Sequence, residues 1–168
     1  EQSTKVTPIG TFEQAVAAAN EKVFQASLSD KALNGMGTTI VATVVFGDTA
    51  YIVNVGDSRL YVYKDTFRQV TIDHSLVEEM VQSGKLLKED MRTHPNKNII
   101  TRALGTNSEV KADCFEIEVD EGDVLLLCSD VLSNMLEDEK IERIIRSNRE
   151  DMSEAGRQLV QEANEAGG

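Results

Sequence analysis

Residues 51–64 read YIVNVGDSRLYVYK, and this segment is the clearest guide to the fold. Its first half is an apolar run that ends at Val55, and its second half alternates polar and apolar residues from Arg59 onward. Each half has the length and residue types of a β-strand, and the triplet Gly56-Asp57-Ser58 between them is typical of a turn. The segment therefore predicts two consecutive strands, with an acidic residue directly after the first.

The residues on either side extend this pattern. Segment 38–46 is rich in β-branched residues and is separated by Gly47-Asp48 from the strand at 50–55. The strand at 59–64 is followed by a turn and another strand at 67–71, so four short strands with tight turns predict an antiparallel meander. Two more strands are expected at 113–119 and 124–128, around a turn at 120–123.

Helical patterns surround the strands. Apolar residues recur at helical spacing over 11–29, where Thr11 and Gln14 have the spacing of a capping box. Shorter helices are expected at 74–83, ended by Gly84, and at 88–93, and amphipathic helices at 138–147 and 153–166. Strand runs flanked by helices predict an α+β or sandwich-type architecture.

Length and composition restrict the class of protein. A chain of 168 residues with 40% hydrophobic residues fits one globular domain with its own core. The net charge of −12 disfavours nucleic acid and anionic membranes as partners, and no apolar run reaches the roughly 20 residues of a membrane helix. Cys114 and Cys128 do not form a disulfide framework, which fits a cytoplasmic location. No signal peptide is visible, but the chain starts at Glu1 rather than Met, so this absence is weak evidence about the location of the protein.

Two aspartates are candidate metal ligands. Asp57 follows the run YIVNVG, and Asp130 follows the run VLLLCS at 124–129. The sheet fixes the backbone of such a residue while its oxygens reach a cleft, which suits a hard cation such as Mg²⁺ or Mn²⁺. The alternative is that each aspartate only caps a turn or a helix.

Other polar residues have structural explanations that weigh at least as much. Arg59 fits a turn residue that pairs with a surface acid. Asp73-His74-Ser75 cannot be a catalytic triad, because a triad is assembled in space, and Asp73 or Ser75 is expected to cap the next helix. Arg102 fits either an anion site or a structural ion pair.

Five short motifs follow one another over nearly the whole chain. Together they resemble the bacterial branch of the metal-dependent serine/threonine protein phosphatases, the PPM family, type 2C. The motifs are GMGTT at 35–39, VNVGDSRLY at 53–61, DHSLV at 73–77, NIITRALGT at 98–106 and LLLCSD at 125–130. The ending ANEAGG at 163–168 is similar to the helix before the family's last metal-binding motif.

The resemblance implies a partial four-layer α-β-β-α sandwich with antiparallel sheets. It also implies a bimetallic Mg²⁺ or Mn²⁺ centre, at which a metal-bridging water attacks the phosphoryl group of phosphoserine or phosphothreonine. Asp130 matches the aspartate of the Ser-Asp-Gly motif, and Asp57 matches that of the Gly-Asp-Ser-Arg motif; in bacterial members this pair holds a third metal. Residues 72–104 correspond to the mobile flap. The implied partners are phosphorylated proteins and a serine/threonine kinase.

The chain also departs from the family pattern. The N-terminal strands with their phosphate-binding Arg and metal-binding Asp, the Asp-Gly-x-Gly-Gly motif and the final Asp-Asn motif have no counterpart, and Val131 replaces a Gly that can adopt positive φ. We therefore expect residues 1–168 to be one incomplete phosphatase-like domain, weakly active or inactive alone, and able to oligomerise through unpaired strand edges. The alternative is a catalytically inactive phosphatase-like binding or regulatory module.

Overall fold

The computed structural model of the protein describes residues 7–168, so the first six residues of the predicted domain lie outside the described part. This part contains five α-helices, two short 3₁₀ helices and six strands. In chain order they are α1 (Pro8–Ser29), η1 (Lys31–Leu33), β1 (Ile40–Phe46), β2 (Thr49–Val55), β3 (Arg59–Tyr63), β4 (Phe67–Gln69), α2 (Leu76–Gln82), η2 (Lys88–Thr93), β5 (Asp113–Glu118), β6 (Val124–Cys128), α3 (Asp130–Met135), α4 (Asp138–Ser147) and α5 (Met152–Glu165).

The strands form two antiparallel sheets, ordered β1-β2-β5 and β4-β3-β6. The predicted four-stranded meander is therefore wrong at one step, because β2 and β3 belong to different sheets. The chain crosses between the sheets at Gly56, whose φ of 113° favours glycine. A Cβ at this position would lie 2.3 Å from Cγ2 of Thr39, so the close approach of the two backbones also requires glycine.

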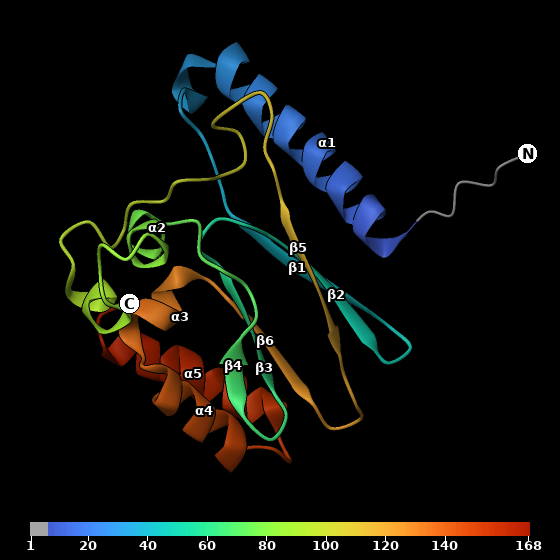
Figure 1. The fold of residues 1–168 in the computed structure, drawn as a ribbon, viewed down its shortest axis with the longest axis vertical. Helices are drawn as coiled ribbons and strands as arrows, with labels where there is room; N and C mark the ends of the chain where they lie inside the picture. The colour runs from blue at the N-terminus through green and yellow to red at the C-terminus, as the bar shows by residue number, and fades with distance from the viewer. Residues whose placement is uncertain (1–6) are drawn as a thin grey trace, which may run out of the picture.

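Three apolar clusters show that the fold has four layers (Figure 1). Val16 of α1 packs against Val53 and Val55 on the outer face of the first sheet. Residues such as Ile52 and Leu60 fill the space between the sheets, and the third cluster joins the second sheet to the C-terminal helices. Its buried members are Tyr63, Leu136, Ile141, Ile144, Ile145 and Leu159. The predicted α+β fold with an α-β-β-α sandwich is confirmed.

Alternation along β5 explains how one strand serves two clusters. Phe115 and Ile117 pack between the sheets, whereas Cys114 packs on the face covered by α1. Cys114 therefore lies on the face of β5 opposite Phe115. The turn after β5 then carries the chain into the other sheet, because β6 pairs with β3 and not with β5.

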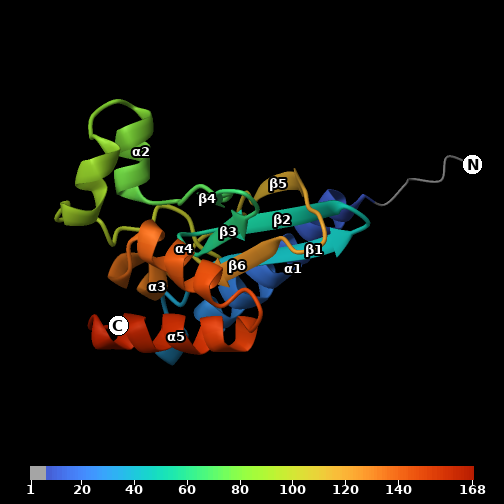
Figure 2. The same cartoon turned by 90° about the horizontal axis from the view of Figure 1, so that it is seen from below.

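The helices differ from the prediction mainly at their ends. The helix α1 begins at Pro8 and is capped by Thr7, whose Oγ1 accepts a hydrogen bond from the Gly10 amide at 3.1 Å. The predicted capping role of Thr11 is wrong, because the helix begins three residues earlier, at Pro8, a residue type that is common in the first turn of a helix. The short helix α3 was not predicted at all. Figure 2 shows α2 and the segment after it projecting from the body of the molecule.

Exposed apolar residues lie on the edge strand β1. Phe46 is 78% exposed and Val45 is 50% exposed, and β1 pairs with one strand among residues 7–168. Oligomerisation through strand edges stays a prediction, to be checked by sedimentation. None of the helices in the described part is both long and apolar enough to cross a bilayer.

Candidate functional site

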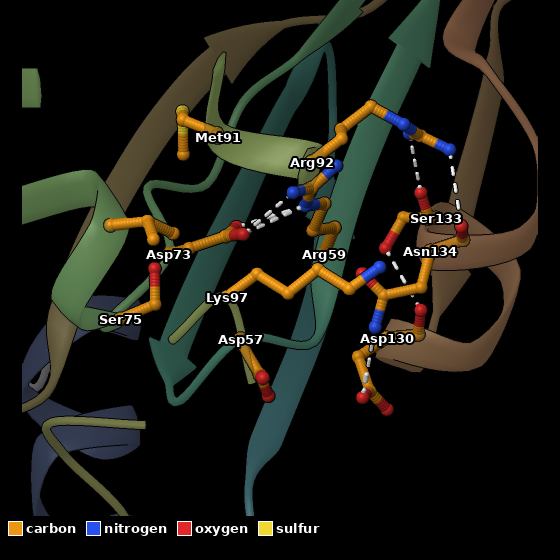
Figure 3. A pocket seen from close by; sticks show the side chains of 11 residues that line it. Asp57, Arg59, Asp73, Ser75, Met91, Arg92, Lys97, Asp130, Ser133 and Asn134 are labelled. Atoms are coloured by element: carbon orange, nitrogen blue, oxygen red, sulfur yellow. Dashed lines mark hydrogen bonds and ion pairs between the residues drawn. The ribbon is translucent and has the colours of Figure 1, made fainter. Parts of the chain in front are cut away.

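Asp57 and Asp130 come together because of the register between β3 and β6. Arg59 pairs with Cys128 at the end of this antiparallel ladder. Two positions beyond this pair, on each strand, are Asp57 and Asp130. Continuing the register therefore brings the two carboxylates to the same end of the second sheet, where both line one cleft (Figure 3).

Each aspartate is held by a different local structure. Asp57 lies in the crossover between the two sheets, and Asp130 is the first residue of α3, directly after β6. The Asp130 carboxylate accepts a hydrogen bond from Nδ2 of Asn134, one helical turn later, at 3.3 Å. The carboxylate of Asp130 points to the same end of the cleft as that of Asp57, as Figure 3 shows.

The two carboxylates disturb one another electrostatically. The pKa of Asp57 is raised above its ordinary value, first by burial and second by the negative charge of Asp130. Two ionised carboxylates that repel each other in a partly buried cleft are stabilised by a cation between them. This arrangement fits a hard divalent cation better than it fits two independent caps.

Replacing Asp57 with asparagine is expected to raise the stability of the metal-free protein near neutral pH by up to about 1 kcal/mol, because the site is partly open to screening by solvent. Since the folded-state pKa of Asp57 is raised, its ionised form opposes folding at higher pH, and this penalty vanishes below the ordinary value of 3.8. The gain from Asp57→Asn should therefore shrink on acidification. Urea unfolding at several pH values measures it.

The exposed Asp65, in the turn between β3 and β4, supplies a control for this experiment. Asp65→Asn should change stability by no more than a few tenths of a kcal/mol at any pH. With Mn²⁺ added, the original protein should become more stable than Asp57→Asn, because the cation binds more tightly when Asp57 is present. A gain from Asp57→Asn that did not depend on pH would contradict the repulsion between the two aspartates.

A buried ion pair supports the β3 end of the site. Nε of Arg59 lies 3.0 Å from both carboxylate oxygens of Asp73, and Nη2 donates to Oδ2 at 2.7 Å. Arg59 also donates to the Tyr61 hydroxyl, which donates in turn to Asp138. The expected surface partner for Arg59 is therefore wrong, because Asp73 is buried. Asp73 does not cap α2; Ser75 does, through a hydrogen bond from the Glu78 amide.

A second network fixes the backbone next to Asp57. Nδ1 of His74 accepts a hydrogen bond from the Gly56 amide at 3.0 Å, so Nε2 carries the proton and donates to Asp113 at 3.1 Å. Arg102 donates to the other oxygen of Asp113 at 2.7 Å. Burial raises the pKa of Asp113, but the bonds from His74 and Arg102 lower it by more. Arg102 is thus part of a structural ion pair, and His74 positions the crossover rather than forming a triad.

Besides Arg59, two basic residues belong to the lining of this cleft. Lys97 and Arg92, both from the predicted flap region, line it together with Asp57 and Asp130 (Figure 3). Sequence reasoning missed both residues, because a Lys or Arg in a polar loop has no distinguishing pattern. Their position beside the carboxylates depends on how the segment 72–104 folds back over the end of the second sheet.

The described residues supply only part of a metal site. Over residues 7–168, no group of three or more His, Cys, Asp or Glu side chains is placed to hold a metal ion. Two aspartates offer the right donor atoms for Mg²⁺ or Mn²⁺, but these ions need a larger coordination shell. The arrangement therefore fits a divalent cation that other ligands or water complete.

Val131 takes a normal helical conformation. No residue other than glycine has positive φ in the described part of the chain, and Val131 is the second residue of α3. The positive φ that the family's glycine allows is therefore not used at Val131, because this residue lies inside the helix that begins at Asp130. A Cβ on Gly168 would lie 2.7 Å from Cγ1 of Val131, so Gly168 packs against α3 close to Asp130.

Val131→Gly is expected to lower the free energy of unfolding by about 0.5 kcal/mol, because glycine costs more than valine inside a helix. Because Val131 is unstrained, the change should leave the affinity of the Asp130 site for Mn²⁺ within about twofold of the original. Thermal unfolding and a Mn²⁺ titration measure the two effects. A clear rise in Mn²⁺ affinity would show instead that the valine side chain obstructs the site.

Comparisons with known proteins agree on one family. The family model for protein phosphatase 2C matches residues 3–166. The serine/threonine phosphatase stp of Listeria innocua is 41% identical over 158 residues, which is 94% of this chain and 62% of that protein. The chain thus spans less than two thirds of the length of this relative.

Solved structures give the same result. The crystal structure of serine/threonine phosphatase Stp1 from Staphylococcus aureus superimposes with a TM-score of 0.90 at 31% identity, covering 99% of this chain and 65% of that one. The catalytic domain of the serine/threonine protein phosphatase PstP, in complex with two manganese ions, superimposes with a TM-score of 0.86 at 29% identity, covering 99% and 69%.

Proposed function

The chain belongs to the protein phosphatase 2C family, and we therefore propose that the protein hydrolyses phosphoserine and phosphothreonine in other proteins. Mn²⁺ or Mg²⁺ is the expected cofactor, held in part by Asp130 and Asp57. The expected substrates are phosphorylated proteins, among them the targets of a serine/threonine kinase.

One observation carries the proposal furthest. Asp57 and Asp130 come from separate parts of the sequence, yet the ladder between β3 and β6 brings both into one cleft. Burial and, second, the negative charge of Asp130 raise the pKa of Asp57, so placing these charges together in the cleft has a cost. Two carboxylates that only cap a turn and a helix would gain nothing from this repulsion. A bound cation would offset it, because its positive charge attracts both carboxylates.

The surrounding residues would have distinct roles. Asn134 holds one oxygen of Asp130, and the His74 bond to Gly56 fixes the backbone that carries Asp57. Lys97 adds a positive charge to the wall of the cleft, which favours the approach of a phosphoryl group. When bound, a divalent cation lowers the pKa of its water and offsets the phosphate charge.

Two carboxylates are too few for a bimetallic centre. The remaining ligands of the proposed site would come from the part of the relatives' length that this chain does not cover, since 62% of the stp protein is matched. Gly168 lies against Val131, the residue that follows Asp130. We expect the 168-residue chain alone to show little or no hydrolysis.

The test is an assay with phosphothreonine, phosphoserine and phosphotyrosine peptides, in the presence of Mn²⁺, Mg²⁺ or a chelator. The natural reading frame around this segment supplies the protein to be assayed. Release of phosphate from the first two peptides, dependent on the metal, is the expected result. Hydrolysis that persisted in chelator would contradict the proposal.

A phosphatase-like binding module remains the second candidate. The observation in its favour is that Asp73, the third carboxylate lining the cleft, is paired with Arg59, so that residues 7–168 leave only Asp57 and Asp130 for a metal ion. Such a module would bind phosphopeptides without releasing phosphate. A reading frame without further metal-binding aspartates, together with phosphopeptide binding, would favour this function.

A further inference from the structure

Arg92 connects the flap to the helix that begins with Asp130. It lies in η2, within the predicted flap region, and its guanidinium group reaches the carboxyl end of α3. Nη1 donates to the Ser133 carbonyl at 2.8 Å, and Nη2 donates to the Asn134 carbonyl at 3.1 Å. A third contact, from Nη1 to the Leu136 carbonyl, is longer at 3.4 Å.

These carbonyls lie at the end of a short helix. The last carbonyls of any helix lack partners within the helix, and they carry partial negative charge that favours a cation. The helix α3 has only six residues, so one side chain that binds two or three of its carbonyls holds a large part of it. Arg92 thus acts as a cap supplied by a distant segment.

The same helix connects this cap to the metal-site carboxylate. Asn134 accepts from Arg92 with its main-chain oxygen, and its side-chain amide donates to the carboxylate of Asp130. Ser133, whose carbonyl also binds Arg92, donates through its hydroxyl to the Asp130 carbonyl at 3.3 Å. Two residues therefore contact both Arg92 and Asp130.

The flap has open space beside this contact. A groove runs between the flap and the body of the protein, and Arg92 lies on its wall. Its flap side includes Lys88, Met91 and Thr93, and its other side includes Gln69, Val70 and Asp138. Because the groove separates the two sides, a movement of the flap would act on α3 through Arg92.

We propose that Arg92 is a positioning residue, which couples the position of the flap to the orientation of the Asp130 carboxylate. This inference rests on the proposed metal-binding role of Asp130. A flap that closes over a phosphorylated substrate would then strengthen metal binding at Asp130, and a bound metal would favour the closed flap, since coupling between two sites is reciprocal.

The test uses amide hydrogen exchange and Mn²⁺ binding on the 168-residue chain and its Arg92→Ala variant. Without metal, the variant should exchange faster in both residues 131–137 and residues 88–97. Its dissociation constant for Mn²⁺ should rise about 3–10-fold, less than the roughly 10–100-fold typical of groups that touch a metal ligand directly. Mn²⁺ should slow exchange in the flap of the original chain and not in the variant.

Three further variants separate this coupling from general destabilisation. Glu137→Ala removes the largely exposed partner of the Arg92 Nε and leaves the carbonyl contacts, so it should change the Mn²⁺ affinity less than about twofold. Arg146→Ala removes another arginine from the last turn of a helix, α4, away from the cleft, and should have no effect on the flap. Arg92→Lys should restore part of the coupling, since lysine supplies charge without the planar fork.

The outcomes distinguish this inference from the proposed function. Unchanged Mn²⁺ affinity in Arg92→Ala, or exchange that rises in the flap alone, would overturn the coupling and leave the proposed function intact. An original chain that binds no Mn²⁺ at Asp130 would contradict the proposed metal site and, with it, the coupling. Faster exchange in both the flap and α3, together with weaker Mn²⁺ binding, would support the coupling through Arg92.

Discussion

Replacing Asp130 with alanine is expected to lower kcat/KM for a phosphothreonine peptide by more than about 100-fold, in a protein that shows the proposed activity. Loss of a group that merely supports a metal ligand costs about 10–100-fold, and a ligand itself should cost more. Asp57→Ala should have a smaller effect, about 10-fold, because we assign Asp57 to an accessory cation. Steady-state kinetics over a range of Mn²⁺ concentrations measures both effects.

The concentration dependence adds a second criterion. Excess Mn²⁺ should restore part of the activity of Asp57→Ala but not that of Asp130→Ala. Asp65→Ala, on the exposed turn between β3 and β4, should match the original protein. If Asp130→Ala retained most of its activity, Asp130 would be a helix residue rather than a ligand, and the proposed site would be wrong.

Replacing Arg59 with alanine is expected to lower the free energy of unfolding by about 3 kcal/mol, since removing one partner of a buried pair leaves a charge without compensation. The side chains of Arg59 and Asp73 are 18% and 8% exposed, so water cannot easily replace the lost contacts. The melting temperature should fall by roughly 6–12 °C for a protein of this size. Calorimetry or circular dichroism measures the change.

The matched control is Arg157→Ala. Arg157 pairs with Glu154, three residues earlier on α5, but these side chains are 67% and 50% exposed. Its removal should leave the free energy of unfolding almost unchanged, because exposed ion pairs contribute little. Arg59→Lys should be intermediate, because lysine keeps the charge and loses the two-pronged contact with Asp73. Equal effects at Arg59 and Arg157 would contradict the importance of the buried pair.

Much of the fold was predictable because the sequence patterns are local. Strand β6 has the predicted bounds, Val124–Cys128, and helix α4 has the predicted bounds, Asp138–Ser147. Both follow from residue type and periodicity within one segment. The pairing of strands was less accessible, because the turn at Gly56 looks the same whether the next strand joins the same sheet or the opposite one. Only packing of the two apolar faces decides between these alternatives.

The candidate site was likewise predictable where it depends on local sequence and not where it depends on long-range contacts. The positions of Asp57 and Asp130 at the ends of apolar strands drew attention to them, but their convergence depends on the register of β3 against β6. The partners of Arg59 and Arg92 could not be predicted, because each contact joins segments that are distant in the sequence. A helix as short as α3, Asp130–Met135, also lacks the repeated apolar spacing on which helix prediction depends.

The interleaved pairing of the strands has a consequence for how the protein folds. The strands β2 and β3 pair with β5 and β6, which follow 59 to 69 residues later in the chain. During synthesis, neither sheet can be completed until residues 113–128 have left the ribosome. Pairing over such separations is slow, because a long loop must close before its contacts form. The cleft lies where this loop closes, so we expect Asp57 and Asp130 to meet in a late step of folding.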